Sequence, residues 1–511
     1  MAGAMGLKGE AIAAAGKPNV VEASVADLQA AMQAGRLSAV AITQAYLARI
    51  KAIDQAGPRI NSVIELNPDA LAIAAMRDQE RRQGTARGPL HGIPVLFKDN
   101  IATADKMETT AGSLALIGAK PPRDAFLVSR LREAGAVILG KTNLSEWANI
   151  RSTRSTSGWS ARGGLTKNPY ALNRNTSGSS SGSGAAIAAS LAAVAVGTET
   201  DGSITSPSSV NGLVGIKPTL GLISRSGVIP IAHSQDTAGP MTRTVADAAL
   251  LLTAMTGVDA RDPATEASRG KAADYTRFLD VNGLQGARLG VVRKMFGGHD
   301  RVQTLMEAAL AVMRAKGATL IEVEIPHTDK YGDTELEVLL YELKADLNAY
   351  LADLPHAPVR SLREIIAFNE KNNSKEMPHF GQELFIQAEA KGGLDSPAYR
   401  EALANNLRYS RAEGIDAVMR EHRLDALIAP TGGPAWLTDF INGDHYSGSF
   451  TTPAAVAGYP HVTVPAGQIS GLPVGLSFVA GAWQEATLVR LAYAFEQATR
   501  HRQAPTYRAT I

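Results

Sequence analysis

The sequence predicts an α/β protein in which segments far apart along the chain build one sheet. Residues 25–32 and 39–53 place apolar side chains three and four positions apart, which is the spacing of amphipathic surface helices. After this helical part, short β-branched runs such as 93–97 and 136–139 alternate with helical stretches such as 125–134. Such alternation is typical of layered α/β structures.

The rest of the chain combines an apolar segment, a charged helical region and further predicted strands. The longest apolar stretch, residues 184–197, is rich in alanine, and it falls short of the roughly 20 residues that cross a bilayer, so we interpret it as a buried helix. Residues 262–424 are richer in charge and in long helical patterns, for example 334–351, which predicts an insertion covering the core. Strand-like patterns return at residues 424–430, 461–465 and 473–479. We expect these remote segments to complete the sheet.

Composition limits the classes of function. The chain has 511 residues, with 51 Lys and Arg against 49 Asp and Glu, and its formal net charge is +2. Because so small a net charge gives no strong field, we predict neither a nucleic-acid partner nor a membrane partner. The chain has no cysteine, which excludes disulfides, thiolate metal sites and a cysteine nucleophile.

The first residues do not resemble an export signal. They lack a basic start followed by an unbroken apolar run, and Glu10 interrupts the middle of the segment. The sequence as written therefore predicts a cytoplasmic protein, and a periplasmic location stays open. We expect a monomer or a weak homo-oligomer.

Residues 176–207 form the most unusual passage, in which two clusters of serine and glycine flank one apolar segment. A flexible linker is the usual interpretation of such composition, but a linker would not join directly to a strongly apolar segment. Phosphate binding is disfavoured because neither G-x-x-x-x-G-K-[ST] nor G-x-G-x-x-G occurs there. Residues 178–182 match G-x-S-x-G, which would make Ser180 the nucleophile of a hydrolase elbow. That elbow needs a buried strand before the serine, whereas residues 166–176 are polar and turn-forming.

Three segments together resemble the amidase signature family. Residues 177–183 (SGSSSGS) and 198–207 (TETDGSITSP) are similar to its two serine-containing segments, and residues 92–99 (GIPVLFKD) to the segment that supplies its catalytic lysine. The relay serine and the nucleophile of this family lie 24 positions apart, as Ser179 and Ser203 do. Further similar segments are residues 140–146, 166–169, 215–219, 236–240 and 471–476, so the resemblance covers nearly the whole chain.

The resemblance implies the amidase signature fold, a large twisted mixed β-sheet covered by helices on both faces. It implies a single amidase domain over residues 1–511. The expected parts are an N-terminal helical part at 20–90, the signature core at 91–260, a variable, partly helical substrate-pocket region at 261–446 and a C-terminal part at 447–511 that completes the sheet.

The resemblance also implies a catalytic triad in which Ser203 is the nucleophile, Ser179 the proton relay and Lys98 the base. A serine hydroxyl attacks an amide only if a base removes its proton, and lysine is a base only when neutral. Burial among the apolar residues 93–97 would lower the pKa of Lys98. Taken alone, the same segment would instead suggest a surface lysine paired with Asp99.

Two further features of the site come from the family. In the family the relay serine follows a cis peptide, which places that peptide between Gly178 and Ser179 here. The family binds the oxyanion of the tetrahedral intermediate with backbone N–H groups, a role that the resemblance gives to Thr200, Asp201, Gly202 and Ser203. No metal ion and no organic cofactor is implied.

Two positions depart from the general family pattern. Asp201 stands where the family often has glycine, and we interpret it as a tolerated turn residue. Thr205 stands where many members have arginine, which weakens any function that needs that arginine. Thr205 also argues against a glutamine-dependent amidotransferase subunit, the less favoured alternative.

Three segments indicate the substrate. They resemble the corresponding segments of family members that remove ammonia from C-terminally amidated peptides, and they are residues 157–164, 197–203 and 234–241. A peptide amide is therefore the first expected substrate, and the alternative is an aryl acylamide or a carbamate (urethane) hydrolysed by the same triad. A non-catalytic binding protein ranks last. The candidate substrate-binding residues are Trp159, Gly178, Phe380 and Trp436, whose aromatic members are equally well explained by core packing.

Overall fold

The computed structural model describes residues 19–448 and 450–511, and within them one mixed sheet of 11 strands organises the molecule. In their order across the sheet, the strands are β1 (Val63–Leu66), β3 (Val137–Thr142), β2 (Pro94–Lys98), β6 (Val194–Glu199), β8 (Thr237–Thr242), β7 (Val214–Lys217), β12 (His461–Ile469), β13 (Leu472–Val479), β11 (Ala426–Pro430), β9 (Arg288–Val291) and β10 (Thr319–Glu322). The α/β class and the mixed sheet are thus confirmed. A separate small sheet pairs β4 (Trp159–Ser160) with β5 (Gly164–Leu165).

The large sheet contains both parallel and antiparallel pairings, and the edge strand β1 pairs antiparallel with β3. Strands β3, β2 and β6 run parallel to one another, and so do β11, β9 and β10. The strands between these groups, from β8 to β13, pair antiparallel. Strand β12 joins β7 to β13 in the middle of the sheet, so strands from near the C-terminus lie beside strands from the signature core.

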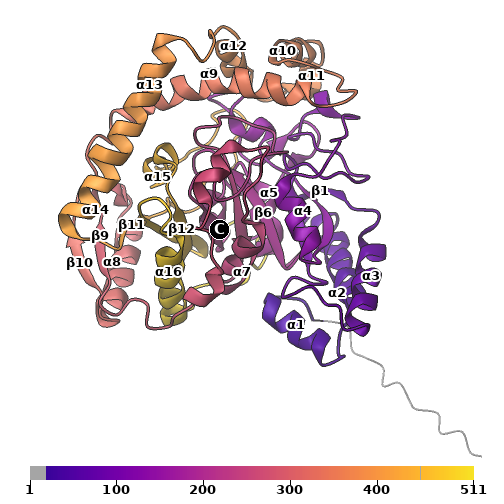
Figure 1. Ribbon diagram of the computed structural model, residues 1–511, viewed down its shortest axis with the longest axis horizontal. Helices are drawn as coiled ribbons and strands as arrows, with labels where there is room; N and C mark the ends of the chain where they lie inside the picture. Colours follow the sequence, from indigo (N-terminus) through magenta and orange to yellow (C-terminus); the bar gives the residue numbers. More distant parts are fainter. Residues whose placement is uncertain (1–18, 449) are drawn as a thin grey trace, which may run out of the picture.

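Helices flank the sheet (Figure 1). They are α1 (Val25–Gln33), α2 (Ala39–Arg49), α3 (Ala70–Arg82), α4 (Phe126–Glu133), α5 (Ser181–Ala188), α6 (Thr205–Val210), α7 (Val245–Met255), α8 (Asp300–Ala315), α9 (Tyr331–Ala352), α10 (Leu362–Lys371), α11 (Asn373–Glu376), α12 (Glu383–Glu389), α13 (Pro397–Leu407), α14 (Asp416–His422), α15 (Thr452–Ala457) and α16 (Glu485–Thr499), with π-helical turns at Ile50–Asp54 and Arg408–Ile415. Figure 1 shows α9 to α13 together along one side of the molecule, away from α1 to α3.

The interpretation of residues 184–197 as one buried helix is wrong. Helix α5 ends at Ala188, Ser190 adopts a positive φ of 52°, and the chain then enters strand β6 at Val194. The reason lies in the neighbours of the second half: Val194 and Val196 belong to a strand that pairs with β2 on one side and β8 on the other. β-Branched residues pack well at such a central position, which the alanine content of the segment obscured.

The region 261–446 does more than cover the core. It supplies the helical layer with α9 to α13, whose apolar side chains form a cluster that includes Leu343, Leu347 and Phe385. It also supplies β9, β10 and β11, which extend one edge of the sheet. The N-terminal part, residues 20–90, which we expected to be helical, likewise adds strand β1 at the opposite edge.

Among residues 19–448 and 450–511, no helix has the length and apolar character needed to cross a bilayer. The segment considered as an export signal lies outside the described residues.

Candidate active site

Lys98 is the last residue of the central strand β2, and its side chain is fully buried. Its Nζ donates to Ser179 Oγ at 2.7 Å, to Thr198 Oγ1 at 2.8 Å and to Thr198 O at 3.3 Å. Thr198 belongs to β6, which pairs with β2, so the sheet itself aligns these two residues. The ammonium and the relay hydroxyl are therefore within bonding reach of each other.

The surroundings of Lys98 favour its neutral form. Burial lowers the pKa of Lys98 to about 7, and the negative charges of Asp236 and Glu199 oppose that shift. The alternative of a surface lysine paired with Asp99 is wrong, because Lys98 has no exposed area and Asp99 instead pairs with Arg162 at 3.2 Å. At neutral pH a substantial fraction of Lys98 is thus an uncharged amine that can accept a proton.

Ser179 lies just before α5, and a cis peptide joins it to Gly178 as the resemblance implied. Its backbone is fixed from the side of strand β3, because Ser145 N donates to Ser179 O at 3.1 Å. Gly178 is confined as well: a Cβ there would lie 2.1 Å from Ser145 Oγ. The contacts of Ser145 thus depend on glycine at position 178.

We therefore expect Gly178→Ala to lower kcat by at least about tenfold, because the added methyl group displaces Ser145 and with it the carbonyl of Ser179. Gly332→Ala is the matched control, since a Cβ there meets nothing within 4 Å. Steady-state kinetics of both variants check the expectation. Equal kcat values for the two variants would contradict it.

Ser203 lies in the turn between β6 and α6 and borders a cavity. Ser180 N donates to Ser203 O at 3.1 Å, which packs the segment of Ser179 against that of Ser203. No hydrogen bond between the hydroxyls of Ser179 and Ser203 occurs in the described part of the chain. The structure thus brings the three predicted residues to one place and joins the first pair, Lys98 and Ser179, directly.

The turn before Ser203 has free backbone donors. Within the described residues, the N–H groups of Asp201, Gly202 and Ser203 make no hydrogen bond. The Asp201 side chain accepts from Thr452 Oγ1 at 2.7 Å, and Gly202 has the positive φ of 76° that such a turn requires. Donors held ready in this way suit a developing oxyanion.

Glu199 explains the threonine at position 205. Its buried carboxylate accepts from Ile204 N at 2.7 Å, from Thr205 N at 2.9 Å and from Thr205 Oγ1 at 3.1 Å. These bonds fix the start of helix α6 immediately after Ser203. The Thr205 hydroxyl therefore adds one side-chain hydrogen bond to a carboxylate that also holds two backbone N–H groups.

The cavity at Ser203 has a volume of about 460 Å³. Its lining comes from residues within 148–157, 200–206 and 442–446, together with Ser177, Gly178, Ile231, Leu339, Trp436, Thr451 and Thr452. Of the candidate substrate-binding residues, Gly178 and Trp436 thus border it. The wall has contributions from the signature core as well as from the region 261–446, which we had expected to form most of it.

Trp159 and Phe380 are not among the lining residues of this cavity. Their rings lie 5.3 Å apart and cover the guanidinium of Arg151, which is 4.4 Å from the Phe380 centroid. Arg151 is fully buried and pairs with Glu146 at 2.7 Å. The two aromatic rings are therefore packing partners of a buried charge, which is the alternative that the sequence had left open.

Ser180 does not have the setting of a hydrolase-elbow nucleophile. Its Oγ donates to Thr198 O at 3.0 Å, its side chain is fully buried, and it is absent from the lining of the cavity. No strand immediately precedes it. The structure agrees with the sequence argument against this alternative.

Three residues of the site were missed by sequence reasoning. Thr198 contacts Lys98, Asp236 accepts from Thr200 Oγ1 at 2.6 Å, and Asp444 accepts from Trp436 Nε1 at 3.1 Å. Thr198 and Asp236 lie within the family-like segments, so their position there was an available signal. Asp444 lies in a loop of the variable region, and no local pattern distinguishes it.

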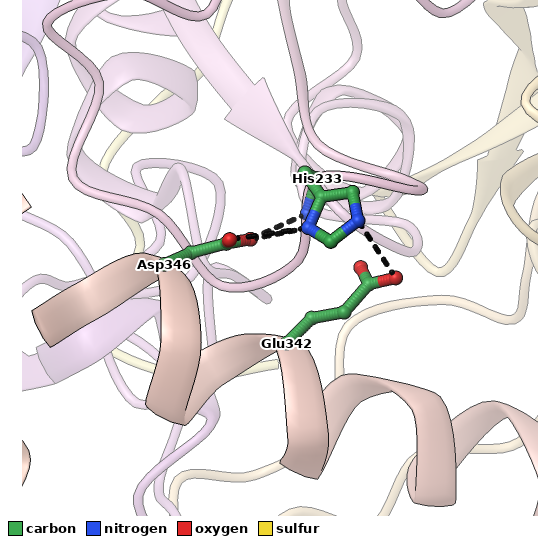
Figure 2. A group of neighbouring side chains, drawn as sticks. All are labelled: His233, Glu342 and Asp346. Carbon is green, nitrogen blue, oxygen red and sulfur yellow. Dashed lines mark hydrogen bonds and ion pairs between the residues drawn. The ribbon is translucent and has the colours of Figure 1, made fainter. Parts of the chain in front are cut away.

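Within the described residues, His233, Glu342 and Asp346 form a group whose ligand atoms lie within 4.8 Å of one another, close enough to hold a metal ion (Figure 2). Both ring nitrogens of His233 already face carboxylates, with Nδ1 at 2.9 Å from Asp346 and Nε2 at 3.3 Å from Glu342. The arrangement is complete as a set of ion pairs, and nothing in its geometry requires a metal.

The fold and a family match together define the class of this protein as an amidase, a hydrolase of amide C–N bonds. The family model described as Amidase matches residues 41–489, and the chain belongs to that family. Its sheet and flanking helices are those of the amidase signature fold.

Several individual proteins are closely similar. A crystal structure of a peptide amidase in complex with the competitive inhibitor chymostatin has 55% sequence identity and a TM-score of 0.93, over 95% of this chain and 99% of the other. The native peptide amidase of Stenotrophomonas maltophilia has 53% identity and a TM-score of 0.92, over 96% and 99% of the two chains. A probable amidase of Arabidopsis thaliana is 44% identical over 96% of this chain and 92% of its own length.

Proposed function

We propose that this amidase hydrolyses C-terminal peptide amides through an acyl-serine intermediate, with Ser203 as nucleophile, Ser179 as relay and Lys98 as base. The observation that carries the proposal is the 2.7 Å hydrogen bond between the buried Nζ of Lys98 and Ser179 Oγ. A buried amine with a pKa of about 7 that touches a hydroxyl near the cavity is suited to draw a proton through that hydroxyl.

In the first half of the reaction, the Ser203 oxygen attacks the substrate carbonyl while its proton passes to Ser179, whose own proton passes to Lys98. The oxyanion receives hydrogen bonds from the backbone N–H groups of the turn from Thr200 to Ser203, since Asp201, Gly202 and Ser203 have no other acceptor among the described residues. When the C–N bond breaks, the relay returns a proton to the leaving nitrogen. Ammonia departs and an ester of Ser203 remains.

In the second half, water attacks the ester with the same groups acting in reverse. Lys98 accepts the proton of water through Ser179, and Ser203 regains a proton as the ester bond breaks. The net reaction converts a peptide amide and water into a peptide acid and ammonia. The chain's own side chains and backbone supply every group that these steps require.

Two observations support a peptide amide over other amides. The similar structures include two of peptide amidase, at 53% and 55% identity, whereas a glutamyl-tRNA(Gln) amidotransferase subunit from Chloroflexus aurantiacus has 36% identity over 94% of this chain. The cavity is also lined by Asn149, whose Oδ1 is buried and has no hydrogen-bond partner among the described residues. A peptide chain brings several backbone N–H donors along its length for such an acceptor, whereas an anilide or a carbamate has only the N–H of its reacting group.

A substrate panel tests the proposal, with amidated peptides, the same peptides as free acids, anilides, carbamates and glutamine as its members. We expect hydrolysis of amidated peptides, measured as ammonia release, at a kcat/KM at least about tenfold above the hydrolysis of anilides or carbamates, measured as amine release; this is a difference of about 1.4 kcal/mol in transition-state binding. Amine release only from anilides or carbamates, with no ammonia from amidated peptides, would overturn the peptide assignment while leaving the triad in place. Release only from glutamine with an added partner protein would favour the amidotransferase alternative.

A further inference from the structure

Helix α9 holds a segment that borders the site, residues 231–236, by three acidic side chains. Asp346 accepts from His233 N at 2.9 Å, Glu342 accepts from Ser234 N at 2.9 Å, and Glu335 accepts from Gln235 Nε2 at 2.8 Å. These carboxylates lie along α9 and face the same segment. The helix from the variable region therefore docks on the core through three consecutive positions of this segment.

That segment in turn holds the turn that contains Ser203. Asp236 accepts from Thr200 Oγ1 at 2.6 Å, and its other oxygen accepts from Ile231 N and Ala232 N at 2.8 and 2.9 Å. Gln235 Nε2 also reaches Thr200 O at 3.4 Å. Two side chains of residues 231–236 thus fix Thr200, three positions before Ser203. Gln235 and Asp236 of the family-like motif at residues 234–241 therefore contact the turn that contains Ser203.

The ring of His233 lies between two of these carboxylates (Figure 2). Its Nδ1 lies 2.9 Å from Asp346, and its Nε2 lies 3.3 Å from Glu342, which is fully buried. Glu342 and Asp346 are four residues apart on one helix, where like charges repel. An imidazolium between them donates to both carboxylates at once, whereas a neutral imidazole has a single N–H and can donate to only one.

We propose that His233, as an imidazolium between Glu342 and Asp346, is a positioning residue that holds α9 against residues 231–236 and so keeps Thr200 and the oxyanion turn in place. The inference rests on the proposed oxyanion role of this turn. This inference gives the variable helical region a part in the reaction. One set of hydrogen bonds joins α9 to residues 231–236, and a second set joins that segment to Thr200.

The charged and titratable groups around His233 determine the direction of its pH dependence. Its hydrogen bond to Asp346 raises the pKa of His233 above 6.5, burial opposes this, and the charges of Glu342 and Asp346 add to it. Arg225 lowers it, and Tyr399 OH lies 3.4 Å from Nε2 while donating to Glu342 at 2.6 Å. A raised folded-state pKa means that the ion pairs are fully present below the unfolded value and are lost as the pH rises through the folded value.

The test is a pH profile of kcat and KM for His233→Gln, His233→Arg and the double variant with His233→Gln and Glu342→Gln. We expect His233→Gln to lower kcat about tenfold with KM less affected, a smaller loss than the hundredfold or more that follows removal of one oxyanion donor. His233→Arg keeps a charge at every pH, so its alkaline loss of activity moves to higher pH. The double variant removes one of the two facing carboxylates and is expected to regain part of the lost kcat.

Controls separate the possible outcomes. His356→Asn replaces an exposed histidine at a positive φ that asparagine tolerates, and it leaves the profile unchanged. If His233→Gln does not fold, as judged by thermal unfolding, Asp346→Asn tests the same ion pair from a partly exposed position. A His233→Gln enzyme with the kcat and alkaline limb of the parent overturns the inference. Full activity of a Ser203→Ala enzyme would instead overturn the proposed function.

Discussion

Replacing Ser203 by alanine is expected to lower kcat for a peptide amide by about 10⁴-fold or more, the largest effect of any single change in this chain. The methyl group cannot form the acyl ester, so only the binding contacts and the backbone donors of the turn remain to lower the barrier. Ser203 is 8% exposed and borders the cavity, so the change removes a hydroxyl without opening the core.

Steady-state ammonia release and mass spectrometry of quenched enzyme measure this effect. The parent enzyme is expected to gain the mass of one acyl group during turnover, and the alanine variant none. Ser206→Ala is the matched control, since Ser206 also borders the cavity and its hydroxyl bonds, among residues 19–448 and 450–511, only to Ser177 Oγ at 2.8 Å. Comparable turnover by the Ser203 and Ser206 variants would remove Ser203 from the mechanism.

The second largest effect is expected from Lys98→Met, which should lower kcat by about 10³-fold or more. The variant keeps an apolar side chain of similar length in the buried position but has no group to accept the proton of Ser179. Lys98→Arg should be nearly as inactive, because a guanidinium stays protonated at every accessible pH and cannot act as a base. Kinetics of both variants, with thermal unfolding to confirm that they fold, measure the effect.

The direction in which kcat/KM changes with pH is a second test of Lys98 as the base. Burial lowers the pKa of Lys98 to about 7, so kcat/KM of the parent enzyme should rise as the pH passes upward through about 7 and the amine becomes neutral. Lys141→Met is the matched control: Lys141 is also fully buried, with a pKa lowered to about 8, but it donates to Ile101 O and Thr109 Oγ1. That variant should lose stability and keep the rise near pH 7. A rise that survives in Lys98→Met would show that another group is the base.

Much of the fold could be predicted because its elements have local signals. Residues 93–97 and 136–139 are rich in β-branched and apolar side chains, as buried strands are, and they overlap β2 (Pro94–Lys98) and β3 (Val137–Thr142). Each strand begins one residue later than expected, and β3 runs three residues further. The helix expected at 334–351 is part of α9. The prediction of one helix at 184–197 was wrong because a short buried helix and a buried strand can have the same composition. Only the pairing of β6 with β2 and β8 identifies the second half as a strand.

The candidate site also has a part that could be predicted from the sequence and a part that could not. Lys98, Ser179 and Ser203 could be proposed because their segments resemble those of the amidase signature family; without that resemblance no local pattern singles them out. The lining of the pocket could not be predicted from the sequence, since Trp159 and Phe380 could either line a cavity or pack in the core. The structure shows that both rings contact Arg151, which is remote from Phe380 in the sequence. Asp444 reaches Trp436 and Ser157 from a loop whose sequence has no pattern.

The sequence by itself determined the α/β class, the resemblance to a family of amide hydrolases and the three side chains that we place in the reaction. The α/β class follows from side-chain periodicity over a few residues, whereas the three side chains follow from the resemblance of short segments to the family. Only the tertiary structure decided that Lys98 is buried against Ser179, that Trp436 borders the cavity, and that α9 is joined to Thr200 through residues 231–236. The physical reason is that burial, a lowered lysine pKa and an ion pair between remote segments arise from what surrounds a residue in space, which no local pattern specifies.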